Sequence, residues 1–457
     1  MIARKLITLM LLLASGAFAA PLPAASESIK LPPGFPAQKD DLDAKAPFKV
    51  VPTNPDLMNG PSYQPIGLNL APESLSPALL ANAESFGFGA YRLTIHEEDF
   101  SDPNSPNLIV LGDVLGKLRS QGAQVMLTME SGMPSPDTFV EFFKRVDGEV
   151  GGMVDYYQLL DNLNYHLGVS AQSYGELLGA VRAYRDAGQR KFSIVCGGIQ
   201  GVDFKFITEL QHAYIFGRVD AIAFNIYPDP AHMEFSTQYE EPSPPSVYET
   251  VQMMAELRRY NKPFFITSFG VSTAYAPLGV SQLDQVSMLC RSVFYLLNGG
   301  ASRIFFASLA DTDLNNLFPQ NCMGLYDYDG IEKPAANAVR RLTPLLKGSY
   351  FFEPYYLFQM HNNFPAAADP LFVHHLYNPV SRATYYIYWT SSMNMYDRTT
   401  NLVIYRPGLD PVAVMNLLTG EVTKPAYNRG GNLLIFAGMP LSHVPFVIQM
   451  TGEKPNG

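Results

Sequence analysis

The chain has 457 residues, of which 47% are hydrophobic, 12% aromatic and 16% charged, and its formal net charge is −10. So little charge with so many aromatic residues excludes an intrinsically disordered protein. No run of Lys or Arg beyond Arg4 and Lys5 offers the basic patch typical of nucleic-acid-binding proteins, so we expect no nucleic-acid partner.

Residues 1–20 have the composition of a secretory signal peptide. Arg4 and Lys5 form a positive start, residues 6–14 are apolar, and Ala-Phe-Ala at 17–19 matches a small-residue cleavage site. The apolar stretch is shorter than the roughly 20 residues that span a bilayer, and no longer apolar run follows. We therefore expect a secreted or periplasmic protein without a membrane span; a buried N-terminal helix is the alternative.

The three cysteines are Cys196, Cys290 and Cys322. An odd count leaves at least one thiol free, and no C-x-x-C spacing suggests a metal site. We interpret them as small buried apolar side chains, with a Cys290–Cys322 disulfide left open. Nothing in the sequence calls for a metal or a cofactor.

A Pro-rich lead-in at 21–60 is followed by short apolar runs that alternate with amphipathic stretches of about 15 residues. The runs predict strands at 66–70, 90–95, 124–129, 154–160, 192–196, 221–226, 264–267 and 304–307. Helical patterns between them include 173–187, 247–260 and 282–298, the last ending at the C-cap signal Gly299-Gly300.

Eight strand–helix units in about 280 residues match a (β/α)8 barrel, which typically takes ~250 residues. A doubly wound α/β sheet is the competing fold, but no G-x-G-x-x-G follows the first predicted strand. We therefore predict a (β/α)8 TIM barrel over 61–346.

After residue 347 the helical periodicity stops. Short strand-like runs at 385–390, 402–405, 412–416, 432–436 and 446–450 are separated by turn signals such as Pro407-Gly408 and Gly430-Gly431. We predict a C-terminal β-sandwich with a short tail over 347–457.

The function of a barrel resides at the C-terminal ends of its strands. Polar residues near these ends, within or just after the predicted strands, are Arg92, Glu97, Glu130, Asp161, Asn162, Asn225, Tyr227, Ser268 and Asp311. We take Arg92, Glu130, Asn162, Asn225, Tyr227 and Ser268 as candidate ligand-binding residues. Tyr91, Tyr165, Tyr275 and Tyr326 are further candidates for the lining of a cleft.

Several segments resemble clan A glycoside hydrolases, close to the family 39 type of β-xylosidases and α-iduronidases. Residues 156–164 (YYQLLDNLN) are similar to the fourth-strand pattern Y-E-I-W-N-E-P-N, and 224–228 (FNIYP) to F-H-x-Y-P on the sixth strand. Residues 262–270 (KPFFITSFG) are similar to K-P-x-x-x-T-E-F-G on the seventh strand. Residues 324–326 (GLY) and 333–335 (KPA) are together similar to the pattern G-L-x…K-P-A after the eighth strand. The resemblance covers nearly the whole mature chain and implies a carbohydrate-active barrel.

Both catalytic positions of that pattern are changed. The resemblance places Asn162 where the family has its acid/base Glu, and Ser268 where it has its nucleophile Glu. Retaining hydrolysis needs two carboxyl groups about 5–5.5 Å apart. An Asn amide has no proton to donate, and a Ser hydroxyl is a weak nucleophile without an activating base. The sixth-strand His is also replaced, by Asn225, so the pattern indicates natural loss of activity.

Three alternatives keep an enzyme open. Asp161 could act as the acid, although neighbouring strand residues face opposite sides and such a shift needs a bulge. Glu130, Glu97 or Asp311 could form a relocated pair of catalytic carboxylates. In the purely structural interpretation, these residues pair with Arg92 or lie solvated at the rim of the barrel. Ser268 could be an activated nucleophile, although the sequence around it lacks G-x-S-x-G.

Arg92 offers a sharper hypothesis. In the resembled family an Arg here pairs with the nucleophile carboxylate, which this chain lacks. A desolvated, unpaired Arg is costly. We therefore expect Arg92 to pair with Glu130 or with an acidic residue after the eighth strand, the alternative being a hydrated Arg at the rim.

These observations predict a secreted, catalytically inactive protein that binds an oligosaccharide or polysaccharide at the barrel mouth. The acidic chain favours neutral or amino-sugar glycans over strongly anionic ones. An active hydrolase with a relocated carboxylate pair is the second hypothesis. The third is a scaffold that binds a protein partner through the sandwich or an exposed apolar patch. The only Trp, Trp389, lies in the predicted sandwich, so the mouth lacks a Trp platform.

Overall fold

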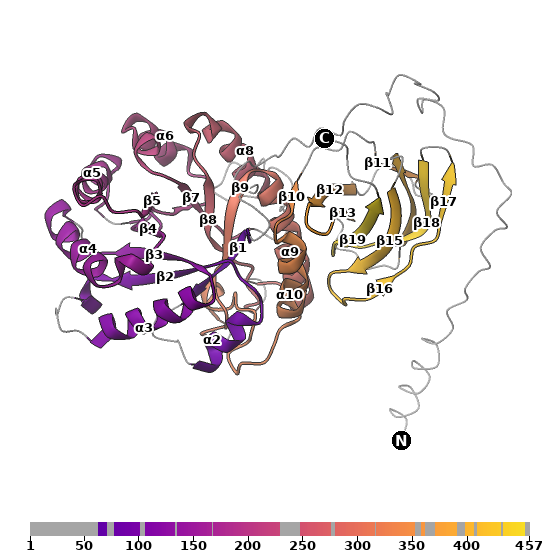
Figure 1. Ribbon diagram of the computed structural model, residues 1–457, viewed down its shortest axis with the longest axis horizontal. Coiled ribbons are helices and arrows are strands. Elements are labelled where there is room, and N and C mark those ends of the chain that lie inside the picture. Colours follow the sequence, from indigo (N-terminus) through magenta and orange to yellow (C-terminus); the bar gives the residue numbers. More distant parts are fainter. Residues whose placement is uncertain are drawn as a thin grey trace. The chain divides into compact units, whose positions relative to one another are not determined.

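A computed structural model describes most of the chain after residue 62 (Figure 1). The described residues are 63–70, 77–100, 106–132, 135–166, 168–228, 247–275, 279–315, 317–351, 358–361, 371–390, 398–405, 409–430 and 433–452. The predicted signal peptide at 1–20 and the lead-in at 21–60 lie outside them.

The described residues contain a parallel sheet of nine strands, in the order β5-β4-β3-β2-β1-β9-β8-β7-β6. The strands are β1 (Ile66–Leu70), β2 (Ala90–His96), β3 (Gln124–Glu130), β4 (Tyr156–Leu159), β5 (Ser193–Val195), β6 (Ile199–Gln200), β7 (Ile222–Ile226), β8 (Phe264–Phe269) and β9 (Ala301–Phe306). A parallel bridge between Val195 and Ala221, and a hydrogen bond from the Cys196 N–H to the Ala221 carbonyl, join β5 to the start of β7. The sheet thus curls into the predicted barrel, in which β5 and β6 together form the fifth strand.

Helices surround these strands (Figure 1). They are α2 (Pro77–Glu84), α3 (Pro106–Ser120), α4 (Pro136–Val150), α5 (Ala171–Ala187), α6 (Phe204–His212), α7 (Ile215–Arg218), α8 (Val247–Leu257), α9 (Gln282–Asn298) and α10 (Pro334–Leu346). Local sequence fixes several ends. Ser135 accepts the Thr138 N–H before Pro136 at the start of α4, and Ser281 caps α9. Helix α9 ends as predicted, and Gly300 follows at φ 112°, a conformation that favours glycine.

The barrel interior has an apolar layer beneath a polar one. Side chains that share one strand face form a small core of Ala90, Met126, Val195, Ala221, Ala223, Phe265 and Phe305. Because strand side chains alternate, the next inward position toward the C-terminal end of β2 is Arg92, that of β3 is Thr128 and that of β7 is Asn225. The apolar layer therefore supports the polar residues that make up the candidate site.

Two antiparallel sheets follow the barrel, as predicted. The six-stranded sheet has the order β10-β12-β13-β19-β15-β16, and the four-stranded sheet, again among the described residues, has the order β11-β14-β18-β17. Their strands are β10 (Tyr350–Phe351), β11 (Phe358–His361), β12 (Leu371–Asn378), β13 (Ala383–Thr390), β14 (Arg398–Tyr405), β15 (Leu409–Asn416), β16 (Val422–Thr423), β17 (Tyr427–Gly430), β18 (Leu433–Leu441) and β19 (Phe446–Gly452). Tyr386 and Ile448 of the larger sheet share a core with Leu402 and Phe436 of the smaller one, which makes the pair a sandwich.

The opposite face of the six-stranded sheet packs on α9. On β13, Tyr386 and Tyr388 belong to the sandwich core, whereas Ile387 and Trp389 join the barrel core, as alternation requires. The Trp389 ring is fully buried and stacks on Phe294 of α9, with 6.3 Å between ring centroids. Burial on both sides explains why nearly every residue of α9 is buried.

All three cysteines are buried and free, so the Cys290–Cys322 disulfide left open by the sequence does not form. Within the described part of the chain, no helix is long and apolar enough to cross a membrane.

Candidate functional site at the C-terminal end of the barrel

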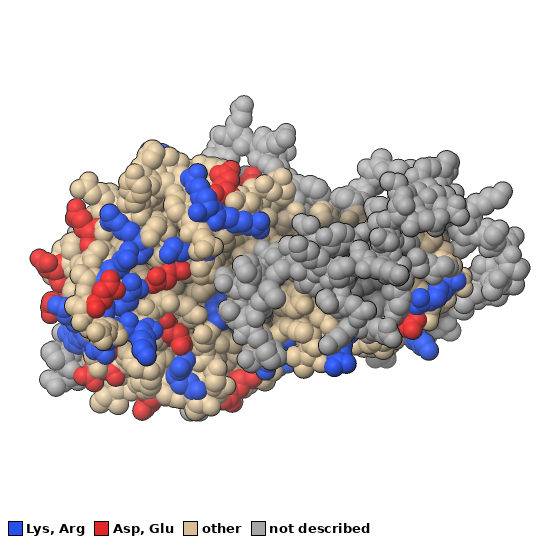
Figure 2. Space-filling model, turned by 45° about the horizontal axis from the view of Figure 1, so that its top comes forward, with Lys and Arg blue, Asp and Glu red and all other residues tan. Residues whose placement is uncertain are grey.

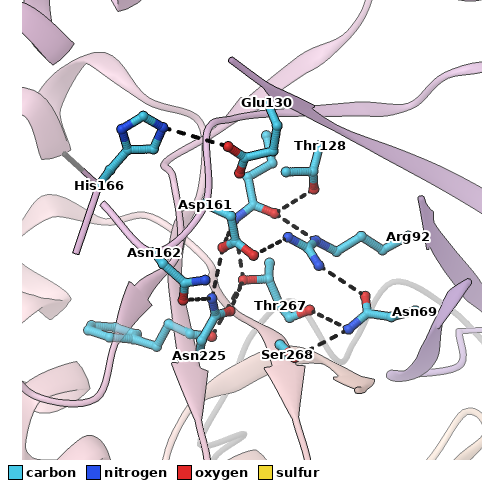
Figure 3. A network of polar contacts seen from close by, with 12 residues as sticks. Asn69, Arg92, Thr128, Glu130, Asp161, Asn162, His166, Asn225, Thr267 and Ser268 are labelled. Carbon is cyan, nitrogen blue, oxygen red and sulfur yellow. Dashed lines mark hydrogen bonds and ion pairs between the residues drawn. The ribbon is translucent and has the colours of Figure 1, made fainter. Parts of the chain in front are cut away.

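A polar network crosses the barrel interior at the C-terminal ends of its strands (Figure 3). Arg92 is its centre: the side chain is only 5% exposed, and its Nη2 lies 2.6 Å from Asp161 Oδ2. Arg92 Nε donates to Gln158 Oε1 at 2.8 Å, and Nη1 donates to Asn69 Oδ1 at 3.3 Å. The expectation that Arg92 pairs with a carboxylate is confirmed, but the predicted partners were wrong, because the partner is Asp161.

Asp161 reaches Arg92 because the backbone is irregular after β4. Leu160 has φ 62° and Asn162 has φ 47°, both in the left-handed region. Because of this local twist, the side chains after β4 no longer alternate between the two faces of the strand. The sequence alone did not reveal this. As a result, Asp161 and Asn162 both face the barrel axis, and Asn225 Nδ2 donates to the Oδ1 atoms of both, at 2.7 and 2.9 Å.

A second irregularity occurs in β8. Its pairing with β7 passes from Phe224–Ile266 to Asn225–Ser268 and so skips Thr267, as in a β-bulge. Thr267 and Ser268 consequently both reach the network: Thr267 Oγ1 donates to Asn225 Oδ1 at 2.8 Å, and Ser268 Oγ accepts from Tyr227 OH at 2.8 Å. Burial raises the pKa of Tyr227, so its hydroxyl keeps the proton that it donates.

Ser268 is not set up as a nucleophile. Its hydroxyl accepts from Tyr227 and, at 3.4 Å, from Asn69 Nδ2, and no histidine or carboxylate of the described residues hydrogen-bonds to it. Without a neighbouring base the hydroxyl stays protonated and weakly nucleophilic. The activated-serine hypothesis thus has no geometric support.

Glu130 ends β3 beside this network, with its side chain 15% exposed. Burial and then the Asp161 carboxylate raise its pKa to about 8, although Arg92 and a hydrogen bond from the Asp161 N–H oppose the shift. Glu130 Oε2 lies 3.8 Å from His166 Nε2 (Figure 3). At neutral pH Glu130 therefore carries a proton. The two oxygens of the neighbouring Asp161 face Arg92 and Asn225.

The other carboxylate candidates are engaged elsewhere. Asp311 and Lys333 form an ion pair at 2.6 Å with both side chains 1% exposed, and Asp311 Oδ1 also accepts the Gly324 N–H. Glu97 Oε2 accepts from Ser131 Oγ at 2.6 Å. The predictions that these residues pair with Arg92 or lie solvated were wrong for Asp311, which is buried with its own cation.

Two of the tyrosines predicted to line a cleft do not do so. Tyr91 alternates with Arg92 on β2, faces outward and packs edge-on against Phe88. Tyr326 packs against Phe86 and hydrogen-bonds to Glu332 at 3.1 Å. Tyr165 and Tyr275, by contrast, are 68% and 66% exposed in the segments after β4 and β8. They remain predictions for contact with a ligand.

Sequence reasoning missed five members of the network: Asn69, Thr128, Gln158, His166 and Thr267. Gln158 joins three strands, because Oε1 accepts from Arg92 and Thr128, while Nε2 donates to Thr267 Oγ1 at 3.3 Å. A signal was present, since Thr128 and Gln158 are polar residues at the inward positions of otherwise apolar strands. Asn69 carried the same signal, since it is the one polar residue of β1 (IGLNL), whereas His166 carried none. In the described ranges, no group of three or more His, Cys, Asp or Glu side chains could hold a metal ion.

Comparisons with known proteins support the fold. No family model and no curated protein matches this chain. A family 39 glycoside hydrolase from the gut symbiont Bacteroides cellulosilyticus has a similar structure, with a TM-score of 0.64, 14% identity, and coverage of 89% of this chain and 82% of that one. A glucosidase from Croceicoccus marinus has a TM-score of 0.57, 14% identity, and coverage of 86% and 97%. SrfJ from Salmonella typhimurium has a TM-score of 0.55, 10% identity, and coverage of 86% and 91%. This chain therefore has the fold of glycoside-hydrolase-type TIM barrels.

Proposed function

We propose that this chain is a carbohydrate-binding protein that has the fold of a glycoside hydrolase but lacks its hydrolytic carboxylate pair. The observation that carries the proposal is the closed network around Asp161. Its carboxylate is held by Arg92 at 2.6 Å and by Asn225 at 2.7 Å, while an amide and a hydroxyl, Asn162 and Ser268, stand at the flanking positions. Such a set of groups binds hydroxyl-rich ligands without transferring a proton or attacking a glycosidic bond.

The polar groups at this end of the barrel favour a neutral glycan. Amide, hydroxyl and carboxyl side chains offer both donors and acceptors, which sugar hydroxyl groups can match. The net charge of −10 also disfavours a strongly anionic glycan. On the surface that Figure 2 shows, acidic and basic side chains of the barrel are interspersed, without a large basic patch for an anionic polymer.

The exposed Tyr165 and Tyr275 supply aromatic faces at the same end of the barrel, because both follow the C-terminal ends of strands. A sugar ring that packs on one of these faces would bury apolar C–H surface while its hydroxyl groups meet the network. We propose these two tyrosines as contacts for the ligand. We also retain export from the cytoplasm as a proposal, on the composition of residues 1–20.

The test combines a glycan array with a hydrolysis assay on every glycan that binds. We expect a neutral oligosaccharide to bind without product release. Asp161→Asn should weaken binding at least about tenfold, because Arg92 loses its counter-ion. Asp155→Asn is the matched control: Asp155 also pairs with an arginine, Arg119, at 2.6 Å, but at the opposite end of the barrel. Failure of every neutral glycan to bind the folded protein would contradict the proposal and favour a protein-binding scaffold.

One observation favours a second candidate, an active hydrolase with a relocated pair. Glu130 is protonated at neutral pH, and the nearby Asp161 carboxylate contributes to its raised pKa. One carboxyl group could therefore serve as the acid and the other as the base or nucleophile. Against it, Asp161 is occupied by Arg92 and Asn225. Product release that Glu130→Gln and Asp161→Asn both abolish, and that Asp155→Asn leaves intact, would establish this candidate and overturn the first.

A further inference from the structure

A pocket of about 610 Å³ lies at the opposite end of the barrel from the polar network. Its lining comes from residues at or near the N-terminal ends of the strands, including Gln124 of β3, Tyr156 of β4, Ser193 of β5 and Arg303 of β9. Its size is within the usual range of small-molecule sites, about 300–1,000 Å³. The network residues are absent from this lining, so the pocket is separate from the candidate site described above.

The wall of this pocket contains a buried cation for which the described residues supply no counter-ion. Arg303 is 4% exposed, and its guanidinium carbon lies 5.2, 5.6 and 6.0 Å from the ring centroids of Tyr63, Tyr156 and Phe265. Nη2 donates to Gln124, Nη1 has no hydrogen-bond partner, and no carboxylate of the described residues forms an ion pair with the group. Aromatic faces offset part of the desolvation cost but leave the positive charge uncompensated.

Two residues of the lining, Tyr156 and Ser193, carry hydroxyl groups that donate no hydrogen bond within the described part of the chain. Tyr156 OH accepts from Gln124 at 3.4 Å, and its own proton has no acceptor within the described part of the chain. Ser193 also lines the pocket, and its hydroxyl has no hydrogen-bond partner among the described residues. Lys347 adds a second cation to the lining. The one carboxylate in the wall, Asp220, is already held by Arg185 at 2.6 Å and by the Ile194 N–H at 2.8 Å.

We propose that this pocket binds a small organic monocarboxylate. The Tyr156 and Ser193 hydroxyls would donate to its carboxylate, while Arg303 supplies positive charge from the wall. Phe88 and Phe265, which also line the pocket, offer an apolar surface to the rest of the molecule. A single negative charge matches the pocket better than a phosphate dianion, because Asp220 opposes further negative charge.

The experiment titrates the full-length protein with sodium acetate, benzoate and glucuronate by isothermal calorimetry. Benzamide and glucose are the uncharged controls, and inorganic phosphate is the dianion. We expect at least one carboxylate to bind saturably with Kd of about 1 mM or tighter, and at least about tenfold more tightly than its uncharged control and than phosphate. Equal affinity for charged and uncharged probes, or no saturable binding by any carboxylate, would overturn the proposal.

Variants assign the binding to this pocket. Arg303→Met should abolish carboxylate binding, whereas Arg119→Met should leave it unchanged, because Arg119 lies at the same end of the barrel but is paired with Asp155. If Arg303→Met does not fold, the double variant Tyr156→Phe/Ser193→Ala decides: a loss of about fivefold or more supports the proposal, and unchanged affinity refutes it. Glycan binding at the other end should persist in these variants, so the two proposals can fail independently.

Discussion

Asp161 shows how one side chain decides the chemistry of this site. Its carboxylate has Arg92 on one oxygen and Asn225 on the other, at 2.6 and 2.7 Å (Figure 3). Both contacts hold the carboxylate group in place. A carboxylate so engaged is well suited to orient a ligand hydroxyl, and poorly suited to attack a sugar or to donate a proton.

Glu130 predicts a pH dependence of stability. Its pKa rises from 4.5 to about 8 on folding, so between these values the folded state binds a proton that the unfolded state does not. Stability should therefore fall as pH rises from about 4.5 to about 8, with a contribution of about 1.4 kcal/mol per pH unit, and level off above that. Urea unfolding of the wild type and of Glu130→Gln across this range measures it. Parallel curves for the two proteins would contradict the raised pKa.

Gly198 predicts a steric effect on the same network. A Cβ built at this position would lie 2.2 Å from Asp161 Oδ1 and 2.6 Å from Asn225 Nδ2, so the amide and carboxylate would have to separate. We expect Gly198→Ala to fold with a loss of about 1–3 kcal/mol and to lose glycan binding. Gly217→Ala is the control, because a Cβ there meets nothing within 4 Å. Glycan binding retained in Gly198→Ala would separate the network from the ligand site.

At the scale of elements, two local irregularities build the site from a regular barrel. A straight end to β4 would turn either Asp161 or Asn162 away from the axis, and an unbulged β8 would do the same to Thr267 or Ser268. Instead, left-handed residues after β4 and the skipped pairing of β8 bring all four side chains to the network. Both irregularities lie at the end of the barrel where function usually resides, which supports this end as the ligand site.

Hydrogen bonds from helix α10 to the turn after β15 allow a prediction of how much the contact between barrel and sandwich stabilises the protein. Arg341 donates to the carbonyls of Leu417, Leu418 and Thr419, at 2.9, 2.6 and 3.1 Å, in the turn after β15. We expect Arg341→Ala to destabilise the protein by about 1–3 kcal/mol, since two partly buried carbonyls and one exposed carbonyl lose a charged donor. Lys144→Ala on α4 should cost less, because the ion pair of Lys144 with Glu141 is exposed. Urea unfolding measures both, and equal losses would contradict this role of Arg341.

At the scale of the whole molecule, the junction of barrel and sandwich predicts acid sensitivity. His374 stacks on Trp389 at 4.9 Å, and burial lowers its pKa from 6.5 to about 3. Burial also lowers the pKa of His443, which lies in the same junction. His443 is therefore uncharged in the folded protein at neutral pH. Below pH 6.5 the unfolded state therefore binds more protons than the folded state, and stability falls as pH drops.

The measurement compares His374→Phe with the wild type from pH 6.5 to pH 4. In the variant, the free energy of unfolding should fall less steeply with decreasing pH, by about 1.4 kcal/mol per pH unit. Phe keeps a stacking ring but does not titrate. The exposed His212 gives the control variant His212→Phe, for which the acid slope should not change. An unchanged slope in His374→Phe would place the acid sensitivity elsewhere.

The sequence by itself determined the barrel and the sheets after it, because hydrophobic periodicity and turn residues act locally. Strand β1 and helix α9 have the predicted bounds, and the five predicted sandwich strands were found to within about five residues. The short, exposed strands β16 and β17 were missed, since their residues carry no apolar pattern, and the long, largely buried β12 was missed as well. The proposal that Asn162 and Ser268 stand where the resembled family has its two carboxylates also rests on the sequence.

Only the tertiary structure decided which side chains meet. The partner of Arg92 is Asp161 rather than Glu130, because left-handed residues after β4 break the alternation on which the sequence argument relied. The unpaired Arg303 and its pocket depend on residues from five or more strands that come together only when the barrel closes. Pairing across a barrel depends on register and bulges over long sequence separations, and these leave no local trace in the sequence.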